Sequence, residues 1–362
     1  MKLAWCTVAA CALAAGCALV VSLDDLGGGS SDASNEGGNP EASCGDTTSS
    51  SSNCGRCGHD CRSGACTSGV CQPALLAAAS QSSSPSFIDV DGANVYWVEG
   101  TTIKRASTAP SDAGVTPLTT VPSPQYLSAK TDIRLVGQLV AGGTFEIFGA
   151  SETQPGDASV LVNSLSASDV RAYGRDTAQD YVYIHNGPCG GNGAGCIQVI
   201  EAGKPVMLAP NLAPDGMLVV DGRVFFYSGS SIQSIAPGED AGVRLATTDA
   251  GGFTSIAADP NGVYVTNGPA KSIMRAPRVA TDGGPPETLV GQQDTPSGAV
   301  ARAGLLVWIT NDGLIGCDPT NCDATKRTYA AAPNYRPAYV TLDSDAIYFT
   351  DAMHGAIWVV VR

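Results

Sequence analysis

A short strand of the form V-Y-x-T/S-N/D recurs along the chain at a nearly fixed spacing, and this repeat limits the fold most. The copies are "VYWVE" (95–99), "VYIHN" (182–186), "FFYSG" (225–229), "VYVTN" (263–267), "VWITN" (307–311) and "IYFTD" (347–351), with "IRLVGQL" (133–139) as a degenerate seventh. A spacing of about 38 to 45 residues is typical of four-stranded propeller blades. The repeat therefore predicts one propeller.

Further strands flank these copies. Strands such as "FIDVD" (87–91), "MLVVD" (217–221), "SIAAD" (255–259) and "YVTLD" (339–343) precede them, and "TIKRAS", "SIQSIA", "SIMRAP" and "AIWVVV" follow. Fourth strands come after polar loops, three of which are alike: "PSDAGV" (110–115), "PGDASV" (155–160) and "PGEDAGV" (237–243). Each blade is thus predicted to be a four-stranded meander.

The last copy ends the chain without a fourth strand, and the missing strand is expected near the start. "ALLAAAS" (74–80) precedes the first blade just as "VRLATT" and "ETLVGQ" precede later ones. An N-terminal strand that completes the seventh blade would close the ring and remove an exposed edge. We therefore predict an all-β fold, a seven-bladed β-propeller over residues 73–362, closed by an N-terminal strand and preceded by a small disulfide-rich module.

Composition agrees with this class and narrows the partners. The 43 glycines and 22 prolines suit many short strands joined by tight turns. The formal net charge is −14, and the 20 basic residues are scattered singly. Phosphate backbones need clustered Lys and Arg, so neither nucleic acid nor a bilayer held by charge is an expected partner.

The first residues form an export signal. "MKLAWCTVAACALAAGCALVV" begins with Lys2, continues as an apolar stretch, and ends at the small residues Ala15 and Gly16 before Cys17. This pattern is typical of a secretory leader over residues 1–16. No second apolar run reaches the roughly 18 residues that span a bilayer.

The Ala-Ala-Gly-Cys ending resembles the lipobox of bacterial lipoproteins, in which the leader is cut before a lipidated cysteine, here Cys17. The match departs from the family because Ala14 stands where Leu is usual, and Cys11 offers a rival site. Ala18 rather than Asp after the cysteine implies, by the same resemblance, sorting to the outer membrane, facing the periplasm or the surface. A plain cleaved leader is the alternative. Residues 17–43, rich in Gly, Ser and acidic side chains, are expected to be a flexible tether.

The ten cysteines after Cys17 divide into a cluster and two close pairs. They are Cys44, Cys54, Cys57, Cys61, Cys66 and Cys71, then Cys189 with Cys196, and Cys317 with Cys322. Even counts in an exported chain predict disulfides. Residues 44–72 carry few apolar side chains, so bridges are expected to hold this module together, in any of 15 connectivities. A zinc knuckle built from Cys54, Cys57, His59 and Cys61 is the rival interpretation. The module resembles Cys-rich segments that precede propellers in surface lipoproteins of large-genome bacteria.

The repeated strands resemble YWTD-type and NHL-type propellers, most closely in "IYFTDAMHGAIWV" (347–359). The YWTD group has six blades and a recurring Asp, which only Asp351 retains here. We expect the recurring tyrosines to serve blade packing. They are Tyr96, Tyr183, Tyr264 and Tyr348.

No catalytic residue is predicted, because the chain has only three histidines and lacks the common hydrolase, phosphate-loop and dinucleotide motifs. Polar residues do fall on loops that meet at one face of a propeller, around the channel. The candidates for binding there are His185, Asn186, Asn267, Asn311, Asp312, Tyr335, Arg336, Asp351 and His354, with Phe253 beside them. No cofactor is predicted. Oxygen ligands of this kind suit Ca²⁺ or a polar ligand, and ordinary turn residues are the alternative.

These observations predict a lipid-anchored envelope protein with a monomeric propeller that serves as a binding platform for an envelope protein or glycan. The rival hypothesis is a divalent-ion-dependent propeller enzyme of lactonase or lyase type. A third is a structural part of a larger envelope assembly. Fold alone does not decide among them, because propellers host all three roles.

Overall fold

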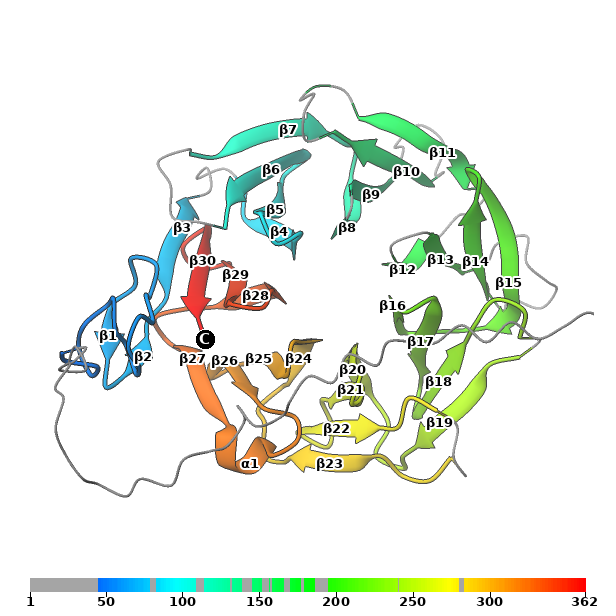
Figure 1. Ribbon diagram of the computed structural model, residues 1–362. Helices are drawn as coiled ribbons and strands as arrows, with labels where there is room; N and C mark the ends of the chain where they lie inside the picture. Colours follow the sequence, from blue (N-terminus) through cyan, green and yellow to red (C-terminus); the bar gives the residue numbers. More distant parts are fainter. Residues whose placement is uncertain are drawn as a thin grey trace, which may run out of the picture. The chain divides into compact units, whose positions relative to one another are not determined.

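Seven four-stranded antiparallel sheets surround a central channel in the computed structural model (Figure 1). The structure describes residues 45–78, 83–108, 114–130, 132–138, 145–151, 156, 158–165, 170–176, 179–185, 195–239, 241–279 and 283–362. The leader, Cys17 and the tether therefore lie outside the described residues. In the described part, no helix is long and apolar enough to cross a membrane.

Each of the first six sheets is a meander of four consecutive strands, ordered from the channel outward. The first three sheets comprise β4 (Pro85–Val90), β5 (Asn94–Glu99), β6 (Thr102–Ser107) and β7 (Thr116–Thr120); β8 (Pro124–Ala129), β9 (Ile133–Gln138), β10 (Phe145–Ala150) and β11 (Ser159–Leu165); and β12 (Val170–Arg175), β13 (Asp180–Ile184), β14 (Gly195–Glu201) and β15 (Lys204–Leu212). The degenerate copy is thus the second strand of the second blade.

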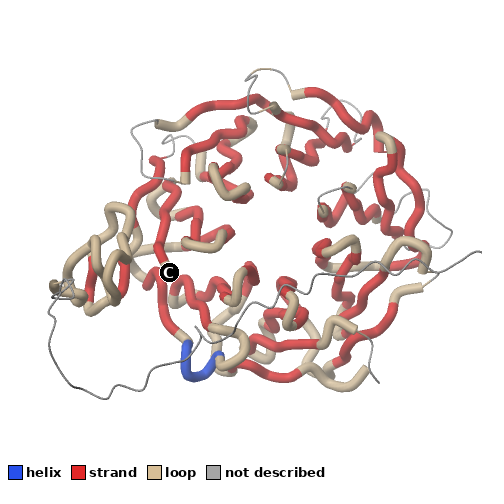
Figure 2. The backbone as a smooth tube through the Cα atoms, viewed as in Figure 1, coloured by secondary structure: helices blue, strands red, loops and turns tan. Residues whose placement is uncertain are grey.

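The next three sheets follow the same plan. They comprise β16 (Gly216–Val220), β17 (Arg223–Ser228), β18 (Ser231–Ile235) and β19 (Val243–Thr247); β20 (Phe253–Asp259), β21 (Gly262–Asn267), β22 (Ser272–Ala276) and β23 (Glu287–Val290); and β24 (Ser297–Arg302), β25 (Leu305–Thr310), β26 (Gly313–Cys317) and β27 (Arg327–Ala331). A one-turn helix, α1 (Cys322–Thr325), precedes β27, and Figure 2 shows it among strands and loops.

The seventh sheet is assembled from both ends of the described chain. β28 (Pro337–Leu342), β29 (Ala346–Asp351) and β30 (Ala356–Val361) are joined by β3 (Ala74–Ala78) as the outermost strand. Ala74 pairs with Val359 and Leu75 with Trp358 in an antiparallel register. The predicted closure is confirmed, and so is the blade count of seven.

The core lies between neighbouring blades. The second strands of three blades, β21, β25 and β29, are buried at every position, because each faces a blade on both sides. Tyr264 of β21, for example, packs in one cluster with Trp308 of β25. The four recurring tyrosines are at most 1% exposed, which confirms their expected role in packing.

The Cys-rich module contains a two-stranded sheet, β1 (Cys66–Thr67) and β2 (Val70–Cys71), and is joined by disulfides. Cys54 bonds to Cys66, and Cys61 to Cys71. Cys57 and Cys196 are also disulfide-bonded, and Cys317 bonds to Cys322 beside α1. Cys44 and Cys189 lie outside the described residues. The cysteine arrangement therefore corresponds to the predicted disulfide framework and not to a zinc knuckle.

Candidate functional site

The loops that join second to third strands, and those that join one blade to the next, lie at the same end of the meanders. At this end, loops of the last three blades enclose a pocket of about 720 Å³, here called the channel-mouth pocket. Its lining includes Thr254, Gly268, Pro296, Ile309, Thr310, Asn311, Pro333, Tyr335, Arg336, Pro337 and Met353. Three of the candidates predicted from the sequence, Asn311, Tyr335 and Arg336, are thus brought together.

Arg336 is positioned through its backbone. Its N–H donates to Oδ1 of Asp351 at 3.1 Å, and its carbonyl accepts from the Ala352 N–H at 3.0 Å. The Arg336 side chain is exposed, and its guanidinium has no hydrogen-bond or ion-pair partner among the described residues. The pocket lining therefore includes one cation, Arg336, whose backbone is fixed by hydrogen bonds and whose guanidinium charge is not neutralised by a described residue.

Asp351 organises the loop beneath this arginine. It is fully buried, accepts the Met353 N–H at 2.9 Å through Oδ1, and binds Nδ1 of His354 through Oδ2 at 2.5 Å. This buried carboxylate accepts three hydrogen bonds, from Arg336, Met353 and His354, so it holds the loop and the imidazole in place. We assign Asp351 a positioning role.

An aromatic group forms one side of the pocket. The ring of Tyr335 packs edge-on against Trp358 and Phe349, with centroids 5.1 and 5.9 Å apart, and against His354 at 6.4 Å. Burial raises the pKa of the Tyr335 hydroxyl, and the charge of Asp351 raises it further. Tyr335 therefore offers the pocket a neutral phenol at physiological pH.

Asn311, another lining residue, is fixed by Asp294. Its Nδ2 donates to Oδ2 of Asp294 at 2.8 Å, and its backbone N–H donates to the Asp294 carbonyl at 3.2 Å. Lys271 pairs with the same carboxylate at 3.5 Å. Asp312, next in the chain, acts through its backbone: its N–H donates to Thr310 Oγ1 at 3.1 Å.

The remaining candidates lie apart from the pocket. His185, in the third blade, contacts the Tyr183 hydroxyl through Nδ1 at 3.2 Å. Asn267 is fully buried, and its side-chain oxygen accepts the Ala270 N–H at 2.9 Å, which shapes the turn. Phe253 is 6% exposed and packs on Tyr227. Asn186 lies outside the described residues.

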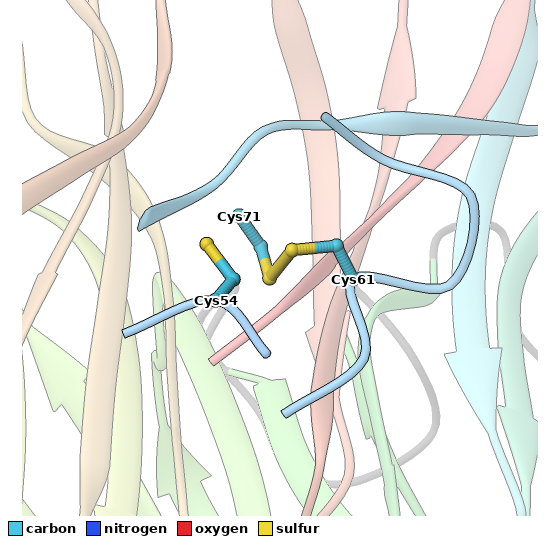
Figure 3. A group of neighbouring side chains, drawn as sticks. All are labelled: Cys54, Cys61 and Cys71. Carbon is cyan, nitrogen blue, oxygen red and sulfur yellow. A yellow bond between two sulfur atoms is a disulfide. The ribbon is translucent and has the colours of Figure 1, made fainter. Parts of the chain in front are cut away.

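One group of three metal-ligating side chains occurs in the described part of the chain. It consists of Cys54, Cys61 and Cys71, whose sulfur atoms lie within 4.8 Å of one another. Figure 3 shows the bond between Cys61 and Cys71, and Cys54 bonds to Cys66. Metal-binding cysteines are thiolates, so these sulfur atoms are structural.

No protein-family model and no curated protein match the sequence. Similar solved structures include a catalytically inactive variant of virginiamycin B lyase from Staphylococcus aureus, bound to quinupristin. Its TM-score is 0.60 at 15% identity, over 80% of this chain and 99% of that chain.

Two further structures have other roles. The WD40 domain of Neurospora crassa Pan2 gives a TM-score of 0.53 at 9% identity, over 79% of this chain and 94% of that one. An extracellular domain described as part of a one-component system of B. thetaiotaomicron gives 0.57 at 11% identity, over 80% and 42%. These similarities show the β-propeller fold alone.

Sequence reasoning did not single out several residues of the channel-mouth pocket. Thr254 donates from Oγ1 to the Pro296 carbonyl at 2.6 Å and so joins the fifth blade to the sixth. Met353 is 62% exposed at the rim. Thr254 follows the predicted Phe253 directly, and Met353 lies between the predicted Asp351 and His354, so the sequence analysis selected their neighbours and not these two residues.

A second hollow lies in the channel at the other end of the innermost strands. Its volume is about 740 Å³, and Asp89, Lys130 and Arg302 contribute its charged groups with Asp91, Asp221 and Asp259. Burial raises the pKa of Asp89, opposed by hydrogen bonds from Ala129 and Val90, and burial lowers the pKa of Lys130. Asp89 and Lys130 join neighbouring blades: Asp89 accepts hydrogen bonds from Thr341 and Ala129, and the Lys130 ammonium donates to the Arg175 carbonyl at 2.5 Å.

Proposed function

We propose that this protein is a lipid-anchored protein of the bacterial outer membrane whose propeller binds a ligand in the channel-mouth pocket. The observation that carries the binding role is the unneutralised guanidinium of Arg336, at the rim of a 720 Å³ pocket with apolar walls. Pockets of this size with few, well-positioned polar groups are typical of binding sites.

The lining indicates the class of ligand. Pro296, Ile309, Pro333 and Met353 offer apolar surface, Arg336 offers a cation, and Asn311 offers an amide oxygen. A ligand with an apolar body, one carboxylate and one N–H or O–H donor would use all three, because Arg binds carboxylates through paired N–H donors and the Asn311 oxygen accepts a hydrogen bond. Acidic glycans and peptides with a terminal carboxylate both have this chemistry.

Thermal unfolding of the full chain tests the pocket against a panel of such glycans and peptides. A ligand at about 100 times its Kd adds about 2.7 kcal/mol to the free energy of unfolding, a shift of several degrees in Tm. The Arg336→Gln variant should lose the shift, and Arg244→Gln, an exposed arginine in β19, should keep it. A shift that survives in Arg336→Gln would contradict the proposal.

Anchoring is tested separately. The lipobox resemblance at Ala15-Gly16-Cys17 supports it, and two or three acyl chains hold a protein on a membrane where one does not. The wild-type chain should carry lipid by mass spectrometry and partition with outer membranes, and Cys17→Ser should do neither. Equal partitioning of both chains would refute the anchor without touching the pocket.

A second candidate function is that of an enzyme of the lyase type, and the pair formed by His354 and Asp351 favours it. Asp351 holds the imidazole at Nδ1, and Nε2 has no partner among the described residues. An imidazole oriented in this way is a common general base or acid. It lies beside Tyr335, which lines the pocket.

Quinupristin and simple lactones are suitable test substrates, followed by mass spectrometry of the products. If the pair is catalytic, His354→Ala should lose turnover, and Arg244→Gln, at an exposed arginine of β19 outside the pocket lining, should retain it. Absence of turnover in the wild-type chain would leave the binding function in place.

A further inference from the structure

A third pocket, of about 680 Å³, lies where the Cys-rich module meets the sixth and seventh blades. It contains four arginines, Arg56, Arg62, Arg327 and Arg362, and is here called the arginine pocket. Loops between first and second strands line it, so it opens at the end of the meanders opposite the channel-mouth pocket. Four of the chain's 20 basic residues are gathered here, in a protein with a net charge of −14.

Two of these arginines, Arg62 and Arg362, form hydrogen bonds within the fold. Arg62 donates to the Thr108 carbonyl and the Tyr348 hydroxyl, at 3.1 and 3.0 Å. Arg362 donates to the carbonyls of Ser344 and Ala303, at 2.6 and 3.0 Å. Their donors are largely satisfied, but their charges remain in the pocket.

The other two arginines lack a carboxylate. The guanidinium of Arg327 lies 4.5 Å over the ring of Tyr329, an arrangement that leaves its edge N–H groups available. Arg56 is exposed. Among the described residues, neither forms an ion pair.

The acidic side chains of the pocket are directed to other partners. Asp60 accepts the Arg62 N–H at 2.8 Å, and Asp345 lies 3.6 Å from the Arg62 guanidinium. Asp345 therefore offsets part of the Arg62 charge, and among the described residues neither carboxylate forms an ion pair with Arg56 or Arg327.

His59 adds an unused group. Its Nδ1 lies 2.5 Å from the Cys54 carbonyl, which can only accept, so Nδ1 carries the proton. Nε2 is buried without a hydrogen-bond partner in the described part of the chain. Buried polar atoms without partners are rare and costly, and this one belongs to a residue that lines the arginine pocket. In this tautomer Nε2 can only accept, so it suits the P–O–H proton of a singly protonated phosphate.

We propose that the arginine pocket binds a phosphate group, with Arg56 and Arg327 as its principal donors. A phosphate offers three or more oxygens and up to two charges, and guanidinium groups match this geometry with paired N–H donors. This site is independent of the proposed function, because it shares no residue with the channel-mouth pocket. The phosphate is either free or carried by a lipid headgroup, and the same residues recognise both.

The experiment compares the full chain with Arg56→Gln/Arg327→Gln, all in a Cys17→Ser background so that no acyl chain contributes. One arm measures inorganic phosphate by calorimetry, and the other measures cosedimentation with phosphatidylglycerol vesicles against phosphatidylcholine vesicles. Arg244→Gln is the matched control. Equal Tm values and disulfide content across the chains show that folding is unchanged.

In at least one arm, the wild type should bind, and the double variant should bind at least tenfold more weakly. The reason is that each charge-assisted hydrogen bond contributes about a factor of ten in affinity. Arg244→Gln should bind as the wild type does. Binding only to vesicles would assign the site to a lipid headgroup, and binding in solution to a free phosphate. Equal binding by the double variant and the wild type in both arms, or no binding by either, would overturn the proposal.

Discussion

The carboxylate of Asp89 accepts a hydrogen bond from the hydroxyl of Thr341 at 3.2 Å, across 252 residues of sequence. Asp89 belongs to β4 of the first blade and Thr341 to β28 of the seventh. The second oxygen of Asp89 accepts the Ala129 N–H of the second blade at 2.8 Å. One carboxylate thus joins three blades where the ring closes.

Thr341→Val should weaken this closure. Valine keeps the shape of threonine but cannot donate, so the half-buried Asp89 loses one of its hydrogen-bond partners. We expect the free energy of unfolding to fall by about 1.5–3 kcal/mol, the range for a hydrogen bond to a charged acceptor. Urea unfolding of the full chain measures it. Thr120→Val, on the exposed outer edge of β7, should change stability by less than about 0.5 kcal/mol, and equal losses in both variants would contradict the assignment.

The closure shows where sequence reasoning succeeds and where it stops. The blades and the strand β3 were predictable because each signal is local: alternating apolar residues, a turn, and a repeat that lacks its last strand. The bond between Asp89 and Thr341 was not, because it depends on how strands far apart in sequence meet at the channel. The same holds for Arg62, whose partner Tyr348 is 286 residues away.

The candidate site was predicted in part for a related reason. Topology alone places Asn311, Tyr335 and Arg336 on loops at one end of the blades, and the structure unites them. Topology does not reveal which side chains turn toward the pocket. Asn267 was therefore predicted as a binding residue, although its amide is buried in its own turn. The tyrosines were expected only to pack, yet Tyr96, Tyr264 and Tyr348 also donate to an aspartate five residues earlier.

Tyr264→Phe should reveal this contact through pH. The hydroxyl donates to Asp259 Oδ1 at 2.8 Å, and burial, followed by that hydrogen bond, raises the pKa of Tyr264 well above its usual value near 10. The folded chain keeps this proton at a pH where the unfolded chain loses it. The stabilisation is therefore complete below pH 10 and is lost as the pH rises toward the folded pKa.

The variant should lose about 1 kcal/mol at pH 8. Its deficit relative to the wild type should shrink above pH 10, because only the wild type carries this titration. Urea midpoints at pH 8 and pH 10.5 measure the difference. Tyr339→Phe, whose tyrosine is 38% exposed, is the control. A deficit that stays constant with pH would contradict the raised pKa of Tyr264, and no deficit at either pH would show that Tyr264 stabilises by packing alone.

The Cys61–Cys71 disulfide should decide whether the module stays folded. The module has little apolar core, and a bridge over ten residues contributes about 3 kcal/mol. In Cys61→Ser/Cys71→Ser, trypsin should cleave after Arg56 and Arg62 at low protease concentration, where the wild type resists. Cys317→Ser/Cys322→Ser removes a bridge near α1 and should leave the module resistant. Equal cleavage of the two double variants would argue against a local role.

Arg62→Gln should loosen the module from the propeller. Arg62 donates to the hydroxyl of Tyr348 in the seventh blade and to the carbonyl of Thr108, which directly follows β6 of the first blade. The Tyr348 hydroxyl in turn donates to Asp343 at 2.9 Å. Glutamine is too short to satisfy both acceptors, so the hydroxyl of Tyr348 and the carbonyl of Thr108 lose a donor. We expect the free energy of unfolding to fall by about 1–2 kcal/mol and the amide hydrogens of residues 54–72 to exchange faster.

Arg56→Gln makes the same change in charge at an exposed arginine, so its exchange rates and stability should equal those of the wild type. If the amides of Arg62→Gln exchanged no faster than those of Arg56→Gln, Arg62 would not secure the module and would only contribute charge to the arginine pocket. The disulfides and the packing of Val361 against the cysteine cluster would then be sufficient to hold the module in place.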